Sequence, residues 1–311
     1  MRGSVTVQVK RALPAYIILA ALVITASLLS PKFRTVNNFS NIFLQAAPLT
    51  IASIGQAIVL ISGGIDISIG SVVSLSTVIM ASLSTVIGPL PALLVAILAG
   101  LAAGTLNGFG VSHFKIPPLI ITLSVSAIFR GISLLVMTRP GGRISPSLLF
   151  FTQTIGPISV NALIAICLYA LVFAVHHYTR LGRYWYALGG NRLHARESGL
   201  PVERLTVLSY MASGFFAALA GFMLSIRIYS GDPIIGDSYS MDTVAASVVG
   251  GILLSGGIGS VAGAFAGAMI LSMINNVLNM LRVFAYYQYI IKSLILIIAL
   301  LVFQLKRRSG K

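Results

Sequence analysis

The stretch Ile61-Ser62-Gly63-Gly64-Ile65-Asp66-Ile67-Ser68-Ile69-Gly70 interrupts a long apolar region with paired glycines and an acidic residue. Only six of the 311 residues are acidic. A carboxylate at membrane depth costs roughly 2.5–3.5 kcal/mol on insertion scales, so it normally faces protein or a water-filled cavity. Glycines weaken a helix, and irregular backbone at membrane depth is tolerated only where protein or water covers it. The stretch therefore predicts a broken helix inside a membrane protein.

The composition of the whole chain is that of a polytopic membrane protein. Apolar residues make up 57% of it, charged residues 9%, and the mean hydropathy is +0.97. The formal charge of +15 comes from bases between the apolar runs, where they act as orientation signals, which argues against nucleic-acid binding. The single cysteine, Cys167, excludes an intrachain disulfide framework.

The apolar runs predict an all-α protein with about ten transmembrane helices in one domain, residues 1–311. A helix needs roughly 20 residues to cross the ~30 Å hydrocarbon core. The predicted spans are 14–30, 42–62, 65–86, 90–112, 117–137, 160–178, 205–228, 243–256, 259–281 and 287–304. Glycine pairs interrupt the third and eighth spans, and interrupted segments in corresponding positions point to a transport pathway. We therefore predict two inverted five-helix halves with broken helices three and eight.

The basic residues predict that both termini lie in the cytoplasm. With the amino terminus inside, thirteen bases fall on the cytoplasmic side and six on the outer side. An even number of spans, such as ten, then returns the carboxy terminus to the cytoplasm. The first apolar run follows Lys10 and Arg11 and also fits a cleavable signal peptide, but we expect it to remain as an anchor.

Residues 179–204 form the longest predicted cytoplasmic connection. Asn191 is placed to cap a short helix through Ser198, which Gly199 would end and Pro201 would keep from continuing. Such a helix, held parallel to the membrane, is a docking element for another protein. An interfacial helix whose arginines meet anionic lipid is the alternative.

Polar residues in the spans each have two interpretations. Asp66, with Ser62 and Ser68, either belongs to a translocation pathway or gate, or caps a helix near the cytoplasmic interface. Arg130 in the fifth span and Lys292 in the last either snorkel toward the interface or pair with a carboxylate.

Three amides, Asn275, Asn276 and Asn279, occupy about one turn of the ninth span. They either bind sugar hydroxyls along the pathway or hydrogen-bond across helices. The same span carries Gly259, Gly263 and Gly267 at four-residue spacing, which predicts close helix packing within the subunit.

The outer loop after the seventh span holds half of all the acids, Asp232, Asp237 and Asp242. Asp232 and Asp237 are candidates to receive basic residues of a substrate-delivery protein, and a solvated loop is the alternative. Asp242 is a further candidate to cap the eighth span. A cluster of aromatic residues is expected to lie in the interfacial belt, with a contact to the pathway as the alternative: Tyr286, Tyr287 and Tyr289.

Several segments together resemble the permease subunits of ribose-type ATP-binding-cassette (ABC) importers. The resemblance runs in order from about residue 14 to residue 305. It is carried by 62–70, Gly189-Gly190-Asn191 with Ala195, Ser198 and Gly199, 241–251, 255–259, Phe129-Arg130-Gly131-Ile132, Asn275-Asn276 and Tyr286-Tyr287-Gln288. It implies a permease in the inner membrane that pairs with a second permease subunit, identical or paralogous. Cytoplasmic ABC ATPase subunits supply the energy and an extracytoplasmic sugar-binding protein delivers the substrate.

The resemblance also assigns residues 179–204 as the coupling loop to the ATPase. The coupling residues would be Gly189, Gly190, Asn191, Ala195, Arg196, Glu197, Ser198 and Gly199. The chain itself has no Gly-x-x-x-x-Gly-Lys-Ser/Thr loop, so ATP would act through a partner. The residues show neither a metal-ligand spacing nor a catalytic constellation, and we expect a transport subunit without a cofactor. Permeases for nucleosides or branched-chain amino acids, an ion-coupled transporter and a membrane-embedded enzyme are the alternatives.

Overall fold

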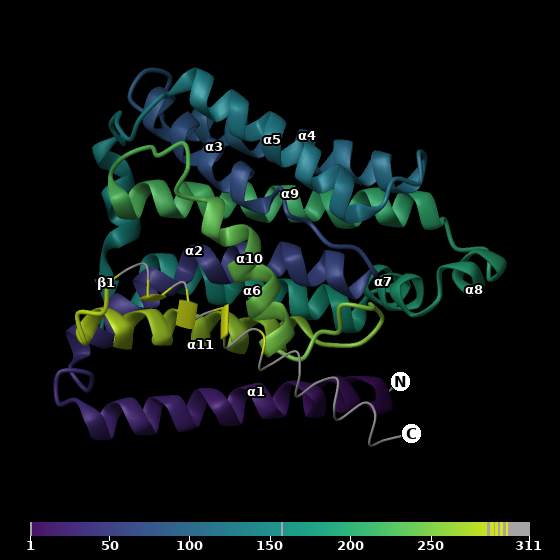
Figure 1. Cartoon of the computed structure of the whole chain (residues 1–311), viewed down its shortest axis with the longest axis horizontal. Coiled ribbons are helices and arrows are strands. Elements are labelled where there is room, and N and C mark those ends of the chain that lie inside the picture. Colours follow the sequence, from purple (N-terminus) through teal and green to yellow (C-terminus); the bar gives the residue numbers. More distant parts are fainter. Residues whose placement is uncertain are drawn as a thin grey trace.

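The computed structural model describes residues 2–156 and 158–284, together with residues 287, 288, 290, 291, 293, 294 and 297. Most of this part of the chain is helical (Figure 1). In chain order the α-helices are α1 (Arg2–Leu29), α2 (Val36–Ile61), α3 (Ile69–Leu83), α4 (Pro89–Ser112), α5 (Pro118–Val136), α6 (Val160–Tyr178), α7 (Arg180–Gly190), α8 (Arg192–Glu197), α9 (Val202–Ile228), α10 (Asp237–Val249) and α11 (Val261–Met280). A 3-10 helix, η1 (Pro146–Thr152), and a small antiparallel pair, β1 (Thr154–Ile155) and β2 (Ile158–Ser159), connect α5 to α6.

Within the described residues, seven helices are long and apolar enough to cross a membrane: α1, α2, α4, α5, α6, α9 and α11. The predicted all-α, multi-pass architecture is thereby confirmed. The first nine predicted spans each correspond to a helix, although α3 and α10 have only 15 and 13 residues. The tenth span, 287–304, falls mostly outside the described residues, as do Tyr286, Tyr289, Lys292 and the basic carboxy terminus. The arrangement of ten spans stays a prediction.

Helix α9 packs against α2, α3 and α4, and glycines make the closest of these contacts possible. Gly100, Gly104 and Gly108 of α4 all face α9, because a β-carbon at any of them would collide with the α9 backbone. In α11, Gly267 contacts the Ala246 carbonyl of α10 in the same way, and Gly263 contacts the carbonyl of Gly250, the residue directly after α10. Small residues at such spacing allow helix backbones to approach closely. The prediction of tight packing within the subunit is confirmed for these two glycines.

Both broken helices differ from the predicted boundaries. The third predicted span, 65–86, becomes helical only at Ile69, since residues 64–68 follow an irregular path. The eighth, predicted over 243–256, is α10 and begins earlier, at Asp237. Hydropathy missed this start because the first turns of α10 carry two aspartates and two serines. Helix α10 ends before Gly250, and Gly251 has a φ of 88°, which favours glycine and ends the helix.

The starts of α3 and α10 lie directly against each other. A β-carbon on Gly70 would overlap the Gly236 carbonyl, and one on Gly236 would overlap the Gly70 carbonyl. The Ser240 hydroxyl donates to the Ile67 carbonyl at 2.7 Å, and the Gly236 N–H donates to the Ser74 hydroxyl at 2.8 Å. The two broken segments are therefore joined through backbone groups and short serine side chains.

Candidate functional site

Asp66 lies in the irregular segment between α2 and α3, where it is 1% exposed and surrounded by hydrogen-bond donors. Its Oδ1 accepts from the N–H and the hydroxyl of Ser68, at 2.9 and 2.6 Å. Its Oδ2 accepts from the Ser213 hydroxyl of α9 at 2.7 Å. The Asn107 amide of α4 donates to Asp66 Oδ1 at 3.4 Å and to the Ser68 hydroxyl at 2.8 Å. The carboxylate thus ties the broken segment to two neighbouring helices.

The surroundings of Asp66 differ from one of its two predicted interpretations, that of a helix N-cap. The residue at the N-cap of α3 is Ser68, so the prediction of Asp66 as the N-cap is wrong by two positions. Asp66 is not among the residues that line three cavities of the described part of the chain, which have volumes of about 220, 10 and 370 Å³. Ser62 does not join the network, because its hydroxyl donates to the Val59 carbonyl at the end of α2. Asp66 and Ser68 therefore act together, and Ser62 lies apart.

The predicted coupling loop consists largely of the helices α7 and α8. The Asn191 side chain accepts from the N–H groups of Leu193 and His194, at 2.9 and 3.1 Å, so the predicted helix cap is confirmed. Gly199 has a φ of 78° and follows the end of α8, as expected. Ala195 is buried in a small apolar cluster with Val202. Figure 1 shows α8 projecting from the end of the molecule at which α1 begins.

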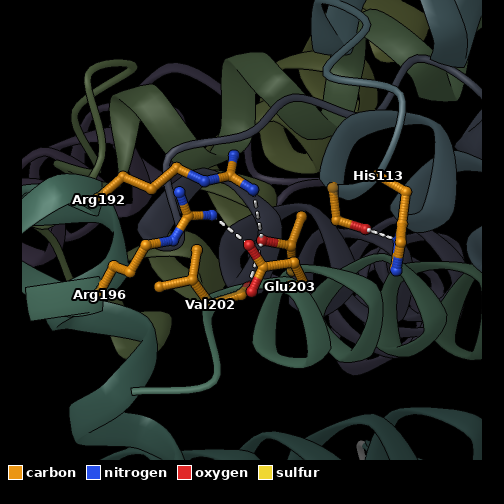
Figure 2. Close-up of polar contacts among 7 residues, drawn as sticks. His113, Arg192, Arg196, Val202 and Glu203 are labelled. Atoms are coloured by element: carbon orange, nitrogen blue, oxygen red, sulfur yellow. Dashed lines mark hydrogen bonds and ion pairs between the residues drawn. The ribbon is translucent and has the colours of Figure 1, made fainter. Parts of the chain in front are cut away.

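Two arginines of α8 point back toward the start of α9 (Figure 2). Arg192 donates to the Thr206 hydroxyl at 3.2 Å, and Arg196 forms an ion pair with Glu203. Together with Lys115, both arginines line a cavity of about 370 Å³. On the exposed side of α8, His194 and Glu197 lie 3.1 Å apart, and Ser198 and Gly199 are exposed too. Helix α8 therefore offers a charged surface while its arginines hold it to the membrane domain.

Five glycines from three distant parts of the chain meet at the end of α7. We call this the glycine junction, and its members are Gly63, Gly189, Gly190, Gly256 and Gly257. The Gly257 N–H donates to the carbonyl at the end of α2 at 2.9 Å. A β-carbon on Gly189 would overlap that same carbonyl, and one on Gly256 would lie 2.6 Å from the Gly63 α-carbon. The end of α7 is thus wedged between the irregular segments that follow α2 and α10.

The glycine junction was not predicted, although repeated glycine pairs at the ends of apolar runs could have indicated it. Tyr186 of α7 strengthens the same contact, because its hydroxyl donates to the Gly259 carbonyl at 2.9 Å. Burial raises the pKa of this tyrosine. Of the predicted coupling residues, Gly189 packs toward the membrane domain, whereas Arg196 and Glu197 are exposed.

A cavity of about 220 Å³, which we call the polar cavity, lies between α2, α9, α10 and α11, near the ends of α9 and α11. Its lining includes four amides and two opposite charges: Gln45, Asn275, Asn279, Gln288, Arg227 and Asp242. Gln288 donates to Asn279 Oδ1 at 2.9 Å, and Arg227 donates to the Gln45 carbonyl at 3.3 Å. The Asn275 side-chain oxygen is buried and has no hydrogen-bond partner among the described residues. These groups offer both donors and acceptors to a ligand.

The three amides predicted as a group are divided by the structure. Asn275 and Asn279 line the polar cavity. Asn276 lies on the other face of α11, where its amide donates to Asn38 Oδ1 of α2 at 3.0 Å. The interpretation as a hydrogen bond between helices is therefore confirmed for Asn276, and a role of Asn275 and Asn279 in the pathway stays a prediction.

The acidic residues near the start of α10 have different surroundings. Asp237 pairs with Arg130 of α5 at 3.0 Å, and each side chain is a little under half exposed. The alternative in which Arg130 pairs with a carboxylate is confirmed. Asp232 accepts from the N–H groups of Ile234 and Ile235, which fixes the turn before α10. Asp242 lies within α10, so the prediction that it caps this helix is wrong.

The family model described as "Branched-chain amino acid transport system / permease component" matches residues 38–300. The chain belongs to this permease family. Among the similar permeases is the ribose import permease protein RbsC of Escherichia coli (strain K12), which is 36% identical over 306 residues, covering 94% of this chain and 92% of the relative. RbsC of Haemophilus influenzae is 37% identical over 295 residues, covering 92% and 91%. RbsC of Bacillus subtilis (strain 168) is 33% identical over 286 residues, covering 90% and 88%. The predicted resemblance to ribose-type permeases is confirmed.

Proposed function

We propose that this permease is the membrane-spanning subunit of an ABC importer that carries a monosaccharide across the inner membrane. The observation that carries the proposal is the 33–37% identity to ribose import permeases over about nine-tenths of the chain. Since the chain has no phosphate-binding loop, ATP hydrolysis belongs to cytoplasmic ATPase subunits. This chain is then a transport subunit, and it works beside a second permease subunit.

The polar cavity favours a sugar over a branched-chain amino acid, the substrate in the family's description. A branched apolar side chain needs hydrocarbon walls. In the described lining of the cavity, only Leu49 has a purely hydrocarbon side chain. An ion-coupled mechanism is disfavoured as well, because Asp66 is enclosed by donors from three elements.

The proposed topology has ten spans in two inverted halves, with both termini in the cytoplasm. The contact between the starts of α3 and α10 supports the inverted halves, because Gly70 and Gly236 meet reciprocally. Such a contact is expected where two corresponding broken helices flank a pseudo-two-fold axis. Helix α8 and the start of α1 lie at the same end of the molecule (Figure 1), and both carry lysine or arginine residues. Basic residues are concentrated on the cytoplasmic side of membrane proteins, which supports a cytoplasmic amino terminus.

The proposed coupling element is α8 with the end of α7. The ATPase would bind the exposed side of α8, where Glu197 and Ser198 are accessible. Movement of α8 would reach the membrane domain through Gly189, which contacts the segments after α2 and α10. Asp66 would hold the first of these segments in register with α4 and α9. Coupling is then a rearrangement of packed elements, with no chemistry in this chain.

The sugar-binding protein would dock at the opposite end, near Asp232 and Asp237. Asp237 is exposed and already balanced by Arg130, so a basic residue of the binding protein would share or replace that pair. Exposed pairs of this kind contribute about 1 kcal/mol or less, so exchange between partners costs little.

The test is reconstitution of the permease in liposomes with its ATPase and its binding protein. The binding protein and ATPase would come from the genes next to that of the permease. Uptake of D-ribose, D-allose, D-galactose and D-xylose is measured with and without ATP, and L-leucine serves as the alternative substrate. These sugars are chosen because similar permeases are named for them. ATP-dependent uptake of one sugar is the expected result. Uptake driven by an ion gradient without the ATPase, or uptake of L-leucine alone, would contradict the proposal.

A further inference from the structure

We propose that the polar cavity is a sugar-binding site on the transport path, in which Asn275, Asn279, Arg227 and Asp242 select the hydroxyl pattern of the cargo. The inference rests on the proposed function of monosaccharide import. It adds the place at which this chain contacts the sugar and the groups that read it.

The chemistry of the walls matches that of a sugar. Each sugar hydroxyl is both a donor and an acceptor, so its ideal partners are groups that also provide both. Side-chain amides supply a carbonyl oxygen and an NH₂ group, a guanidinium supplies five donors and a carboxylate supplies only acceptors. Asn275 and Asn279 provide the first kind of group, and Arg227 and Asp242 provide the others. Charged groups strengthen hydrogen bonds to neutral hydroxyls.

The size of the cavity favours a single sugar ring. Its volume of about 220 Å³ lies below the roughly 300–1,000 Å³ of pockets for drug-sized ligands, so it suits a small ligand. A pentose or hexose with its hydroxyl groups fills such a space. A nucleoside has a second, planar ring system and would need a longer cavity than a single sugar ring does.

The Asn275 side-chain oxygen is a buried cavity-lining acceptor that has no hydrogen-bond partner among the described residues. A buried acceptor without a partner costs about 1–3 kcal/mol, and buried polar groups are usually paired. The oxygen of Asn279, one turn later on the same face, already accepts from Gln288. A hydroxyl in the cavity would satisfy Asn275 without displacing that bond.

The position of the cavity suits a site that receives and releases sugar. Asn275 lies five residues before the end of α11, about 7 Å along the helix axis. Asp237 is the first residue of α10 and is exposed, and Asp242 of the same helix lines the cavity. A sugar released by a protein docked at Asp237 would therefore meet the cavity within the first turns of the bundle.

The experiment compares adjacent amides on the two faces of α11. Asn275→Ala removes a cavity group, whereas the matched control Asn276→Ala removes the amide that binds Asn38. In the reconstituted complex, loss of one hydrogen bond should raise the KM for sugar uptake about 3- to 10-fold in Asn275→Ala. The KM of Asn276→Ala should stay within about twofold of the unchanged protein.

A second measurement detects occupancy directly. In a Cys167→Ser background, Asn275→Cys is treated with a small water-soluble methanethiosulfonate, with and without each sugar of the uptake panel. The transported sugar should slow modification severalfold, and the sugars that are not transported should not. Ser272→Cys, which also lines the cavity, replaces Asn275→Cys if the latter does not assemble with the ATPase.

The outcomes separate this inference from the proposed function. If the unchanged permease imports a sugar but that sugar protects neither cysteine, the cavity is not the binding site. Equal changes of KM in Asn275→Ala and Asn276→Ala would overturn the inference as well. If the unchanged permease imports none of the sugars, the proposed function itself fails.

Discussion

Replacement of Asp66 distinguishes a structural role from a direct role in the transport path. The carboxylate accepts three hydrogen bonds of 2.9 Å or less, two from Ser68 and one from Ser213. Hydrogen bonds between membrane helices contribute about 0.6 kcal/mol each and up to about 1.7 kcal/mol. Asp66→Ala should therefore lower the free energy of unfolding by roughly 2–5 kcal/mol. Asp66→Asn keeps one acceptor oxygen and should lose only about 1–2 kcal/mol.

The assay is unfolding of the purified permease by denaturing detergent, followed by the fluorescence of Trp185. This residue is the only tryptophan and is buried, so its emission changes on unfolding. A double-mutant cycle of Asp66→Ala with Ser213→Ala should show a coupling energy of about 0.6–1.7 kcal/mol. Ser209→Ala is the matched control, since Ser209 is buried four residues earlier on α9 and its hydroxyl donates to Thr206 of its own helix.

The two possible results have opposite meanings. Low yield and low stability of Asp66→Ala, with near-normal uptake by Asp66→Asn, would support a carboxylate that fastens the broken segment. A stable, fully assembled Asp66→Ala permease that imports nothing would refute the reasoning. Equal coupling energies of Asp66 with Ser213 and with Ser209 would refute it too, because of these two serines only Ser213 contacts Asp66.

The remaining predictions concern the coupling region. Gly189→Ala should destabilise the permease severely, because its β-carbon would overlap the Ile61 carbonyl, whereas Gly190→Ala should be tolerated because its β-carbon meets open space. Unfolding in denaturing detergent compares the two variants, and equal stabilities would contradict the close packing of Gly189 at the end of α2. Asn191→Ala should weaken the cap of α8 by about 1 kcal/mol and reduce ATP hydrolysis stimulated by the loaded binding protein, and Asn191→Ser should restore most of it. Glu197→Lys should lower the same stimulated ATP hydrolysis, because it reverses a charge on the exposed side of α8. Its stability should not change, because this exposed side chain pairs only with His194 among the described residues. Unchanged stimulation would count against α8 as the docking element.

Hydropathy and glycine placement predicted most of the helices but not how they break. The apolar runs located α2, α4 and α5 well, since a membrane crossing demands long apolar sequences. The glycine pair Gly250-Gly251 indicated a break in the eighth span, but the predicted span ran on to residue 256, past the end of α10 at Val249. Helix α7 was missed because its sequence is amphipathic rather than apolar, and its burial depends on contacts with α6 and α9.

The candidate sites were only partly predictable because their members come from distant parts of the chain. The four-residue spacing of Asn275 and Asn279 predicted a shared face, and both line the polar cavity. Arg227 and Asp242 join them only through packing of α9 and α10 against α11, which no local pattern contains. Asp66 was recognised from its cost in a membrane, but its partner Ser213 is 147 residues away.

The reciprocal contact between Gly70 and Gly236 sets how quickly the starts of α3 and α10 can separate. Neither glycine has a side chain, so rotamer flips, which take picoseconds to nanoseconds, cannot loosen this contact. Only displacement of whole helices, on the scale of microseconds to milliseconds, separates the two backbones. A contact of this kind persists whichever rotamers the neighbouring side chains adopt, so it holds the two broken segments at a fixed separation.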